Sequence, residues 1–357
     1  MGAQTAIEWA CNPDGTPGAT WNPLRARDKQ TGKVGTFCVH QSPGCINCYA
    51  EVFQGRSLPG NGIGLAYTAQ NLERVDFFLD ENMLQAPARR RKPSTWFLSS
   101  MTDVFAGFVT DAMLDAMFAV MAHNPEQTFI VVTKRADRMR EYINGVPARQ
   151  KSWDCDAGLD FVQWPLRNVW LVVSIEDQRR ANERVPQLLA TPAAVRGVSC
   201  EPLIGPVLLD FMDVENTAPP GFYCINALTG RNTDMARPCP DVPRLDWVIA
   251  GGESGPKARP MHPDWARSLR DQCAVTGVPF FYKQWGEYAP SMSDRPDLVV
   301  ARNGVVDRSL PSKMEGGGPN PLWCAMARVG KKAAGALLDG AEHKARPAFV
   351  HLTKAAA

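Results

Sequence analysis

The sequence has no continuous apolar run of the roughly 18 residues that a membrane helix requires. Its beginning, Met1 to Ala10, lacks the basic region and apolar core that mark a secretory signal. Charge of either sign is nearly balanced, with a formal net charge of +2 over 357 residues, so charge alone does not indicate a nucleic-acid partner. No internal repeat is visible. We therefore expect a cytoplasmic protein (in the host cytoplasm if the source is viral) that does not associate with a membrane.

Hydrophobic residues make up 45% of the chain, enough for the core of one large α/β domain or two ordinary ones. The ten cysteines are not expected to form structural disulfides in a reducing compartment. Scattered cysteines are usually small buried apolar residues, whereas a dense cluster indicates metal binding.

From about residue 95 onward, short apolar runs alternate with amphipathic segments. The runs are rich in β-branched and aromatic residues and lack polar alternation, which is typical of strands buried on both faces. They are Trp96–Leu98, Phe129–Val132, Val169–Val173, Val195–Val198, Trp247–Ala250 and Val278–Tyr282. Helices are expected over Ala112–Ala122, Asp177–Leu189 and Pro263–Val275.

Strands that alternate with helices predict an α/β fold with a parallel sheet. We expect a partial or full parallel (β/α) barrel over residues 1–288, with a doubly wound open sheet as the alternative. An insertion is expected at about 206–244, where Cys224 and Cys239 are too loosely spaced to predict a second metal. Residues 289–357 are expected to form a long loop excursion and a helical extension, with the terminal helix over Met326–Leu338.

Three cysteines, Cys38, Cys45 and Cys48, lie within one eleven-residue segment. Iron–sulfur clusters are held by cysteine thiolates, and three ligands leave one iron of a [4Fe–4S] cluster without a protein ligand. That iron can bind S-adenosylmethionine and support radical chemistry. The spacing of six and then two residues is wider than in most radical enzymes. A zinc site remains open as an alternative, with His40 or a distant cysteine as the fourth ligand.

Polar residues follow each of the apolar runs. In parallel α/β barrels the active site lies at the carboxyl ends of the strands, so these residues are candidates for binding S-adenosylmethionine. The candidates are Ser99, Asp103, Ser174, Glu176, Glu201, Gly251, Gly252 and Glu253. For Gly251–Glu253 a tight strand-to-helix turn is the alternative, and for Glu176 and Glu201 a cap or salt bridge.

Taken together, these segments resemble a phage and prophage family long described as a phage gene product of unknown function and now grouped with radical S-adenosylmethionine enzymes. The resemblance covers nearly the whole chain. It is carried by Thr5–Trp9, Thr20–Pro23, Ser42–Ala50, Ser99–Phe105, Thr133–Met139, Gly251–Pro263, Lys283–Glu287 and Arg328–Gly335. It implies that Cys38, Cys45 and Cys48 are the cluster ligands and that the fold is a radical-enzyme barrel.

Some members of this family belong to phage pathways that hypermodify thymidine in DNA. The resemblance therefore implies an isomerase that converts Nα-glycyl-thymidine to Cα-glycyl-thymidine in DNA. Its partners would be DNA and a host electron donor such as flavodoxin or ferredoxin. An extruded base would need a stacking surface, for which Trp21, Tyr49 and Trp285 are candidates.

Two other functions stay open. One is a different radical reaction on nucleic acid, such as repair by a lyase similar to those that split photoproducts. The other is a zinc-stabilised nucleic-acid-binding module without catalysis. The residue that handles the substrate radical is not identified by the sequence.

Overall fold

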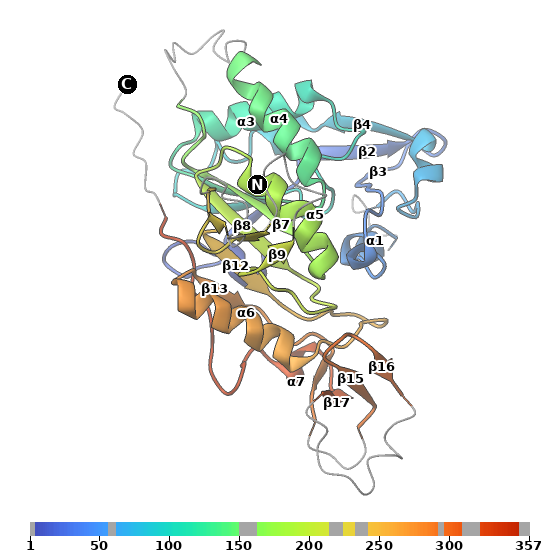
Figure 1. The fold of residues 1–357 in the computed structure, drawn as a ribbon. Coiled ribbons are helices and arrows are strands. Elements are labelled where there is room, and N and C mark those ends of the chain that lie inside the picture. The colour runs from blue at the N-terminus through green and yellow to red at the C-terminus, as the bar shows by residue number, and fades with distance from the viewer. Residues whose placement is uncertain are drawn as a thin grey trace, which may run out of the picture. The chain divides into compact units, whose positions relative to one another are not determined.

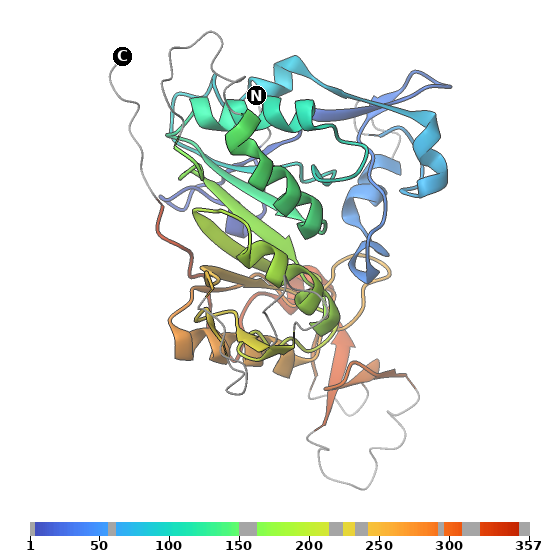
Figure 2. The ribbon, with the colours of Figure 1, turned by 45° about the horizontal axis from the view of Figure 1, so that its top comes forward.

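The computed structural model describes residues 4–55, 62–149, 163–213, 224–232, 242–291, 296–308 and 322–349. The chain forms two compact units. In Figures 1 and 2 the colour follows the residue number from blue to red. The first comprises Met1–Val173, Ala190–Arg196 and Ala348–Ala357, and the second comprises Ser174–Leu189 and Gly197–Pro347. The domain boundary expected at residue 288 stays a prediction.

Four parallel strands form the main sheet of the first unit, in the order β1, β5, β6, β7. They span Ala19–Trp21, Thr95–Leu98, Thr128–Thr133 and Val169–Ser174. All residues of β5 and β7 are buried, which explains why these strands read as unbroken apolar runs. The three strands expected in this part of the chain are confirmed, and β1 was not anticipated.

Two helices, α3 (Asp111–His123) and α4 (Ala136–Arg149), lie side by side in the first unit (Figure 2). The hydroxyl of Tyr142 on α4 donates to the carboxylate of Asp115 on α3 at 2.8 Å. The hydroxyl of Thr110 caps the first turn of α3. The helix expected over residues 112–122 is confirmed.

The first unit also contains a small antiparallel sheet of β3 (Val34–Gly35), β2 (Leu24–Asp28) and β4 (Val75–Leu79). A core cluster beside it consists of Ala26, Phe37, Ala50, Ile63, Leu65, Tyr67 and Val75. Cys38 and Cys48 pack against this cluster, so it forms the apolar base of the cysteine loop. The remaining short helices of the unit are η1 (Glu8–Ala10), η2 (Pro43–Cys45), α1 (Tyr49–Gly55), η3 (Ala69–Arg74) and α2 (Glu81–Leu84).

In the second unit, β8 (Val195–Cys200), β12 (Trp247–Ala250) and β13 (Phe280–Tyr282) are parallel neighbours. The helix α6 (Pro263–Thr276) packs against β12 and β13 (Figure 1), and α5 (Gln178–Leu189) precedes β8 in the chain. Pro263 occupies the first turn of α6, and Gly277 ends it in a left-handed conformation with φ of 70°. The expected strands and both expected helices are confirmed.

The insertion expected at residues 206–244 contains β9 (Met212–Asp213), β10 (Cys224–Asn226) and β11 (Arg231–Asn232), which form a small antiparallel sheet. Cys224 is half-buried. Cys239 lies outside the described residues, so the expectation of no second metal stays a prediction.

The region after residue 288 forms an antiparallel sheet of β14 (Tyr288–Pro290), β17 (Trp323–Arg328), β15 (Leu298–Ala301) and β16 (Val306–Asp307). The helix expected over 326–338 is therefore wrong. Residues 323–328 pair with β14 and β15, and the only helical turn described there is α7 (Lys331–Ala334), which starts after Gly330 and stops at Gly335. Both glycines have positive φ, which interrupts a helix at both ends.

The described strands confirm the α/β class with parallel strands. Within each unit the neighbouring parallel strands follow one another in chain order, as in a barrel, without the reversal that defines a doubly wound sheet. This agrees with a partial parallel barrel. None of the helices in the described ranges combines the length and the apolar content needed to cross a bilayer.

Candidate functional site

The three neighbouring cysteines lie on one folded loop. The short helix η2 turns the chain at Pro43–Cys45, and the amide of Cys48 donates to the carbonyl of Cys45 at 3.1 Å. The amide of Gln41 donates to Sγ of Cys45 at 3.5 Å. All three cysteines are half-buried. The loop therefore carries all three cysteines, and Cys48 directly precedes helix α1.

Electrostatics couples these thiols. Burial raises the pKa of Cys38 to about 11, with Asp103 adding to the rise and Arg135 opposing it. Burial also raises the pKa of Cys48, and a negative charge on Cys45 acts in the same direction on both neighbours. The free thiols of Cys38 and Cys48 thus stay protonated at neutral pH, and a metal that binds them must displace their protons.

The loop is attached to the turn that follows β5. The phenol of Tyr49 donates to the carbonyl of Ser100, and the phenol of Tyr67 donates to the carbonyl of Met101 at 3.3 Å. The amide of Met101 in turn donates to the side chain of Asn22 at 3.2 Å. These contacts place the cysteines at the carboxyl end of the first unit's sheet, the edge where α/β barrels build their active sites.

The turn after β5 contains two candidates for cofactor binding. Ser99 has a φ of 53°, a conformation that costs energy for a residue other than glycine. Its buried hydroxyl, like that of Thr102, has no hydrogen-bond partner among the described residues. Ser99 is thus a strained residue with an unused hydroxyl, a combination that favours a ligand-binding role.

The second candidate, Asp103, is committed to contacts within the protein. Its carboxylate accepts hydrogen bonds from Oγ1 of Thr133 at 2.7 Å, the amide of Lys134 at 2.9 Å and Nη1 of Arg135 at 2.9 Å. The structure therefore places Asp103 beside the cysteines as a support for other groups.

His40, the candidate in this loop for a fourth zinc ligand, has Nε2 at 2.7 Å from Oε2 of Glu51. In the part of the chain that the structure describes, no three His, Cys, Asp or Glu side chains come close enough together to hold a single metal ion.

In the second unit, the candidates after the strands form internal ion pairs. Oε2 of Glu176 lies 2.9 Å from Nη1 of Arg184, which also donates to the carbonyl of Ser174 at 2.7 Å. Oε1 of Glu201 lies 2.9 Å from Nζ of Lys283. Both glutamates therefore form salt bridges, which was the alternative to cofactor binding that the sequence left open for them.

The two glycines at the end of β12 allow close approach of the backbone. A Cβ on Gly252 would lie 1.8 Å from the carbonyl oxygen of Trp285, so no other residue fits there. The following Glu253 forms a bidentate ion pair with Arg259, at 2.8 Å to Nε and 2.5 Å to Nη2. The geometry of Gly251–Glu253 is thus that of a tight turn closed by an ion pair.

Two of the three aromatic side chains expected to stack on a base are part of the core. Trp21 is 1% exposed and donates from Nε1 to the carbonyl of Met83, and Trp285 is 6% exposed and donates to the carbonyl of Leu337. The prediction that Trp21 and Trp285 stack on a base is therefore wrong, because other residues cover the faces of both rings. Tyr49 is 49% exposed and lies next to Cys48.

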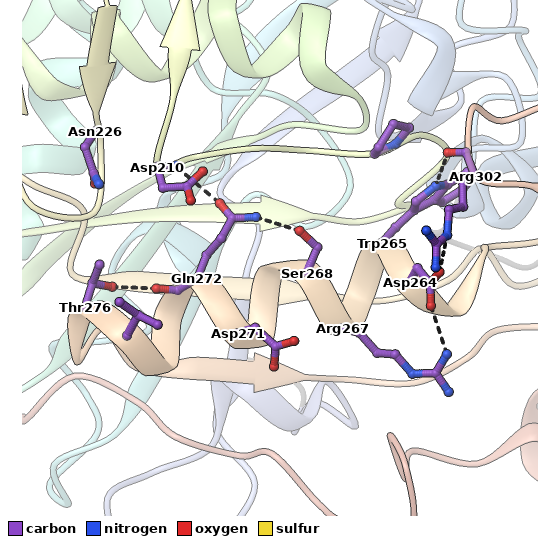
Figure 3. Close-up of a pocket in the computed structure, with 12 residues that line it drawn as sticks. Asp210, Asn226, Asp264, Trp265, Arg267, Ser268, Asp271, Gln272, Thr276 and Arg302 are labelled. Atoms are coloured by element: carbon purple, nitrogen blue, oxygen red, sulfur yellow. Dashed lines mark hydrogen bonds and ion pairs between the residues drawn. The ribbon is translucent and has the colours of Figure 1, made fainter. Parts of the chain in front are cut away.

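A separate groove of about 720 Å³ runs along α6 in the second unit (Figure 3). Its most charged end contains Asp264, Arg267 and Arg302. Asp264 accepts hydrogen bonds from both arginines. Arg267 also pairs with Asp339, so the charged groups at this end of the groove are engaged by other side chains.

Two residues of these sites, Tyr67 and Arg184, carry no signal in the sequence, because their partners are distant or lie in an amphipathic segment. Asn22, Arg135 and Arg259 lie in segments that carry the family resemblance, but the sequence does not indicate their contacts.

Fold and site together define the class: an α/β protein with parallel strands and a three-cysteine loop at the carboxyl end of its first sheet. A family model described as "Protein of unknown function (DUF5131)" matches residues 4–347. The chain belongs to this family. Neither a search of curated proteins nor one of solved structures found a significant match.

Proposed function

We propose that this chain is a radical S-adenosylmethionine enzyme whose [4Fe–4S] cluster is held by Cys38, Cys45 and Cys48. One observation carries the proposal: the three-cysteine loop is tied by Tyr49 and Tyr67 to the turn at the carboxyl end of β5. This is the position where a cluster would face a ligand bound at the strand ends.

The donor set fits such a cluster. Three thiols, one of which accepts an amide hydrogen bond, provide the ligand type that iron–sulfur clusters use, and hydrogen bonds to sulfur tune their potential. The apolar residues around them, including Phe37, Tyr67 and Met101, limit access of water. When bound, the cluster would supply the electron that cleaves S-adenosylmethionine.

The chain's own residues would bind and orient the cofactor. The hydroxyls of Ser99 and Thr102 are unused hydrogen-bonding groups in the turn after β5, and the hydroxyl of Ser42 is another within the cysteine loop. In the second unit, Gly251 and Gly252 would act by allowing close packing at the end of β12, because the carbonyl of Trp285 lies where a Cβ of Gly252 would be. Ser174, Glu176, Glu201 and Glu253 would act mainly by fixing the strand ends, because the three carboxylates are held in ion pairs and the carbonyl of Ser174 binds Arg184.

For the reaction, we propose isomerisation of Nα-glycyl-thymidine to Cα-glycyl-thymidine in phage DNA. The bond between the glycine nitrogen and the thymine methylene breaks, and a bond from the glycine α-carbon to that methylene forms. One hydrogen moves from the α-carbon to the nitrogen, so atoms and electrons balance. The family resemblance supports this substrate, and the exposed ring of Tyr49 offers a surface on which an extruded base can stack.

We further propose that the substrate is DNA, that a host flavodoxin or ferredoxin donates the electron, and that the protein acts in the cytoplasm. Its decisive experiment is anaerobic reconstitution with iron and sulfide, followed by measurement of iron content and of 5′-deoxyadenosine formed with dithionite and S-adenosylmethionine. The wild type is expected to bind about four irons per chain and to form 5′-deoxyadenosine.

Cys45→Ala should lose both properties. Cys11→Ala is the matched control, because Cys11 is a half-buried cysteine outside the loop. A protein that binds one zinc and no iron would refute the radical enzyme and support the nucleic-acid-binding module. Product analysis on DNA containing Nα-glycyl-thymidine, and on DNA containing photoproducts, separates the isomerase from a repair lyase.

A further inference from the structure

Arg135 connects three segments that are distant in the sequence. Its Nη1 donates to Oδ2 of Asp103 at 2.9 Å, and its Nη2 donates to the carbonyl oxygen of Val39 at 2.9 Å. Asp103 belongs to the turn after β5, Arg135 follows β6, and Val39 is the neighbour of Cys38 in the cysteine loop. The guanidinium therefore bridges the ends of two strands and the first cysteine.

This bridge is well shielded from water. The side chains of Arg135 and Asp103 are 12% and 11% exposed. A guanidinium stays charged when it is buried, so its N–H groups need hydrogen-bond acceptors. Because the group is planar with several N–H donors, Arg135 can bind the carboxylate of Asp103 and the carbonyl of Val39 at the same time. A lysine at this position could not hold both acceptors in the same geometry.

The charge of Arg135 also acts on the cysteines. Its Nη2 reaches the carbonyl oxygen of Val39, the residue that follows Cys38, so the guanidinium lies beside the first of the three cysteines. A thiolate or a cluster bound at Cys38 would therefore be close to this positive charge.

We propose that Arg135 is a positioning residue for the cysteine loop, which it fixes through Val39, and that its charge stabilises the reduced form of the bound cluster. The second part rests on the proposed function. Reduction adds a negative charge to the cluster, and a nearby cation held at low water exposure lowers the free energy of that state.

The positional part is tested in the metal-free protein by hydrogen exchange of the amides in residues 36–48. Arg135→Gln should speed their exchange about tenfold, because a charge-assisted hydrogen bond contributes enough to change a local opening equilibrium by that factor. Asp103→Asn, which frees the guanidinium, should act in the same direction. Unchanged protection in both variants would overturn the positional role.

Arg74→Gln is the matched control. Arg74 also pairs with a carboxylate of the first unit, at 3.1 Å from Asp28, and among the described residues its side chain forms no hydrogen bond or ion pair with the cysteine loop. It should leave exchange in residues 36–48 as in the wild type. If Arg135→Gln fails to fold, Arg135→Lys provides the same test, since it keeps the charge and loses the fork.

The electrostatic part is tested by redox titration of reconstituted protein. At a fixed potential, Arg135→Gln should lower the ratio of reduced to oxidised cluster about tenfold, whereas Arg135→Lys should stay nearer the wild type. Equal titrations of wild type and Arg135→Gln would refute the effect of the charge. A wild type that takes up no iron would instead refute the proposed function and, with it, the electrostatic part, while hydrogen exchange still decides the positional part.

Discussion

The carboxylate of Glu176 and the guanidinium of Arg184 form an ion pair in the interior of the second unit, with 2.9 Å between Oε2 and Nη1. Their side chains are 1% and 6% exposed. The same nitrogen of Arg184 donates to the carbonyl of Ser174, so the pair fixes the backbone at the end of β7. Glu176 therefore serves the structure of the strand end.

Removing one charge of this pair should be strongly destabilising. In Glu176→Gln the buried cation of Arg184 loses its counter-charge, and we expect the free energy of unfolding to fall by about 3 kcal/mol. The double variant Glu176→Leu with Arg184→Leu should recover much of this loss, because it leaves no buried charge. Urea denaturation followed by circular dichroism measures both.

A control is available on the same helix. Glu183 pairs with Arg179 at 2.8 Å on the surface of α5, where Arg179 is 76% exposed. Glu183→Gln should change the stability by less than about 0.5 kcal/mol. Equal losses of stability in Glu176→Gln and Glu183→Gln would mean that the buried ion pair stabilises the protein no more than the surface pair does.

The parallel strands and the main helices could be predicted because their signals are local. Residues of β5 and β7 are buried on both faces, which requires continuous apolar runs. Helix α6 is marked by Pro263 in its first turn and by Gly277 after its last. In each case the residues that determine the element lie within it.

The errors concern elements whose structure depends on distant partners. Residues 323–328 are too weakly patterned to predict a strand, and they form one because β14 and β15 supply their hydrogen bonds. The short strand β1 likewise exists through its pairing with β5. Such pairings leave no periodic mark in either segment.

For the cysteine loop, too, the local feature could be predicted from the sequence and the contacts with distant residues could not. The three cysteines were predicted as one group from their spacing alone. Their attachment to Ser100 and Met101 and the bridge from Arg135 to Val39 join residues more than thirty positions apart. Glu253 could be singled out as a carboxylate after a strand, but its engagement by Arg259 depends on how the following turn folds.

The N-terminus of α6 should make stability depend on pH. Nδ1 of His262 accepts a hydrogen bond from the amide of Asp264 at 3.1 Å, which requires an unprotonated nitrogen. Burial lowers the pKa of His262 below 6.5, although the charge of Asp264 opposes the shift. The neutral form is therefore favoured in the folded protein.

The sign follows from proton binding. Below pH 6.5 the unfolded chain takes up a proton at His262 before the folded one does, so the stability contributed by this group is present above pH 6.5 and is lost as pH falls through the folded pKa. His262→Asn keeps a cap that does not titrate. Its unfolding free energy should fall less than that of the wild type between pH 7 and about pH 5. Parallel curves for the two proteins would contradict this assignment.

At alkaline pH we expect the opposite dependence, a loss of stability as the pH rises. Cys273 lies on the inner face of α6 with 1% exposure, and burial raises its pKa from 9.0 to about 12. Cys200 is also buried, and burial together with the charge of Cys273 raises its pKa. Above pH 9 the unfolded chain releases these protons while the folded protein retains them, so stability is lost as pH rises.

For Cys273 alone the loss should approach about 1 kcal/mol for each pH unit between 9 and 12. Cys273→Ala will be less stable at pH 7, because it removes a buried sulfur, but its stability should fall less steeply in this range. The double variant with Cys200→Ala should have a still flatter profile. Urea denaturation at pH 7, 9 and 10 measures the slopes. If Cys273→Ala loses stability with pH as steeply as the wild type, the thiol ionises equally in both states, and its burial does not hold the proton in place.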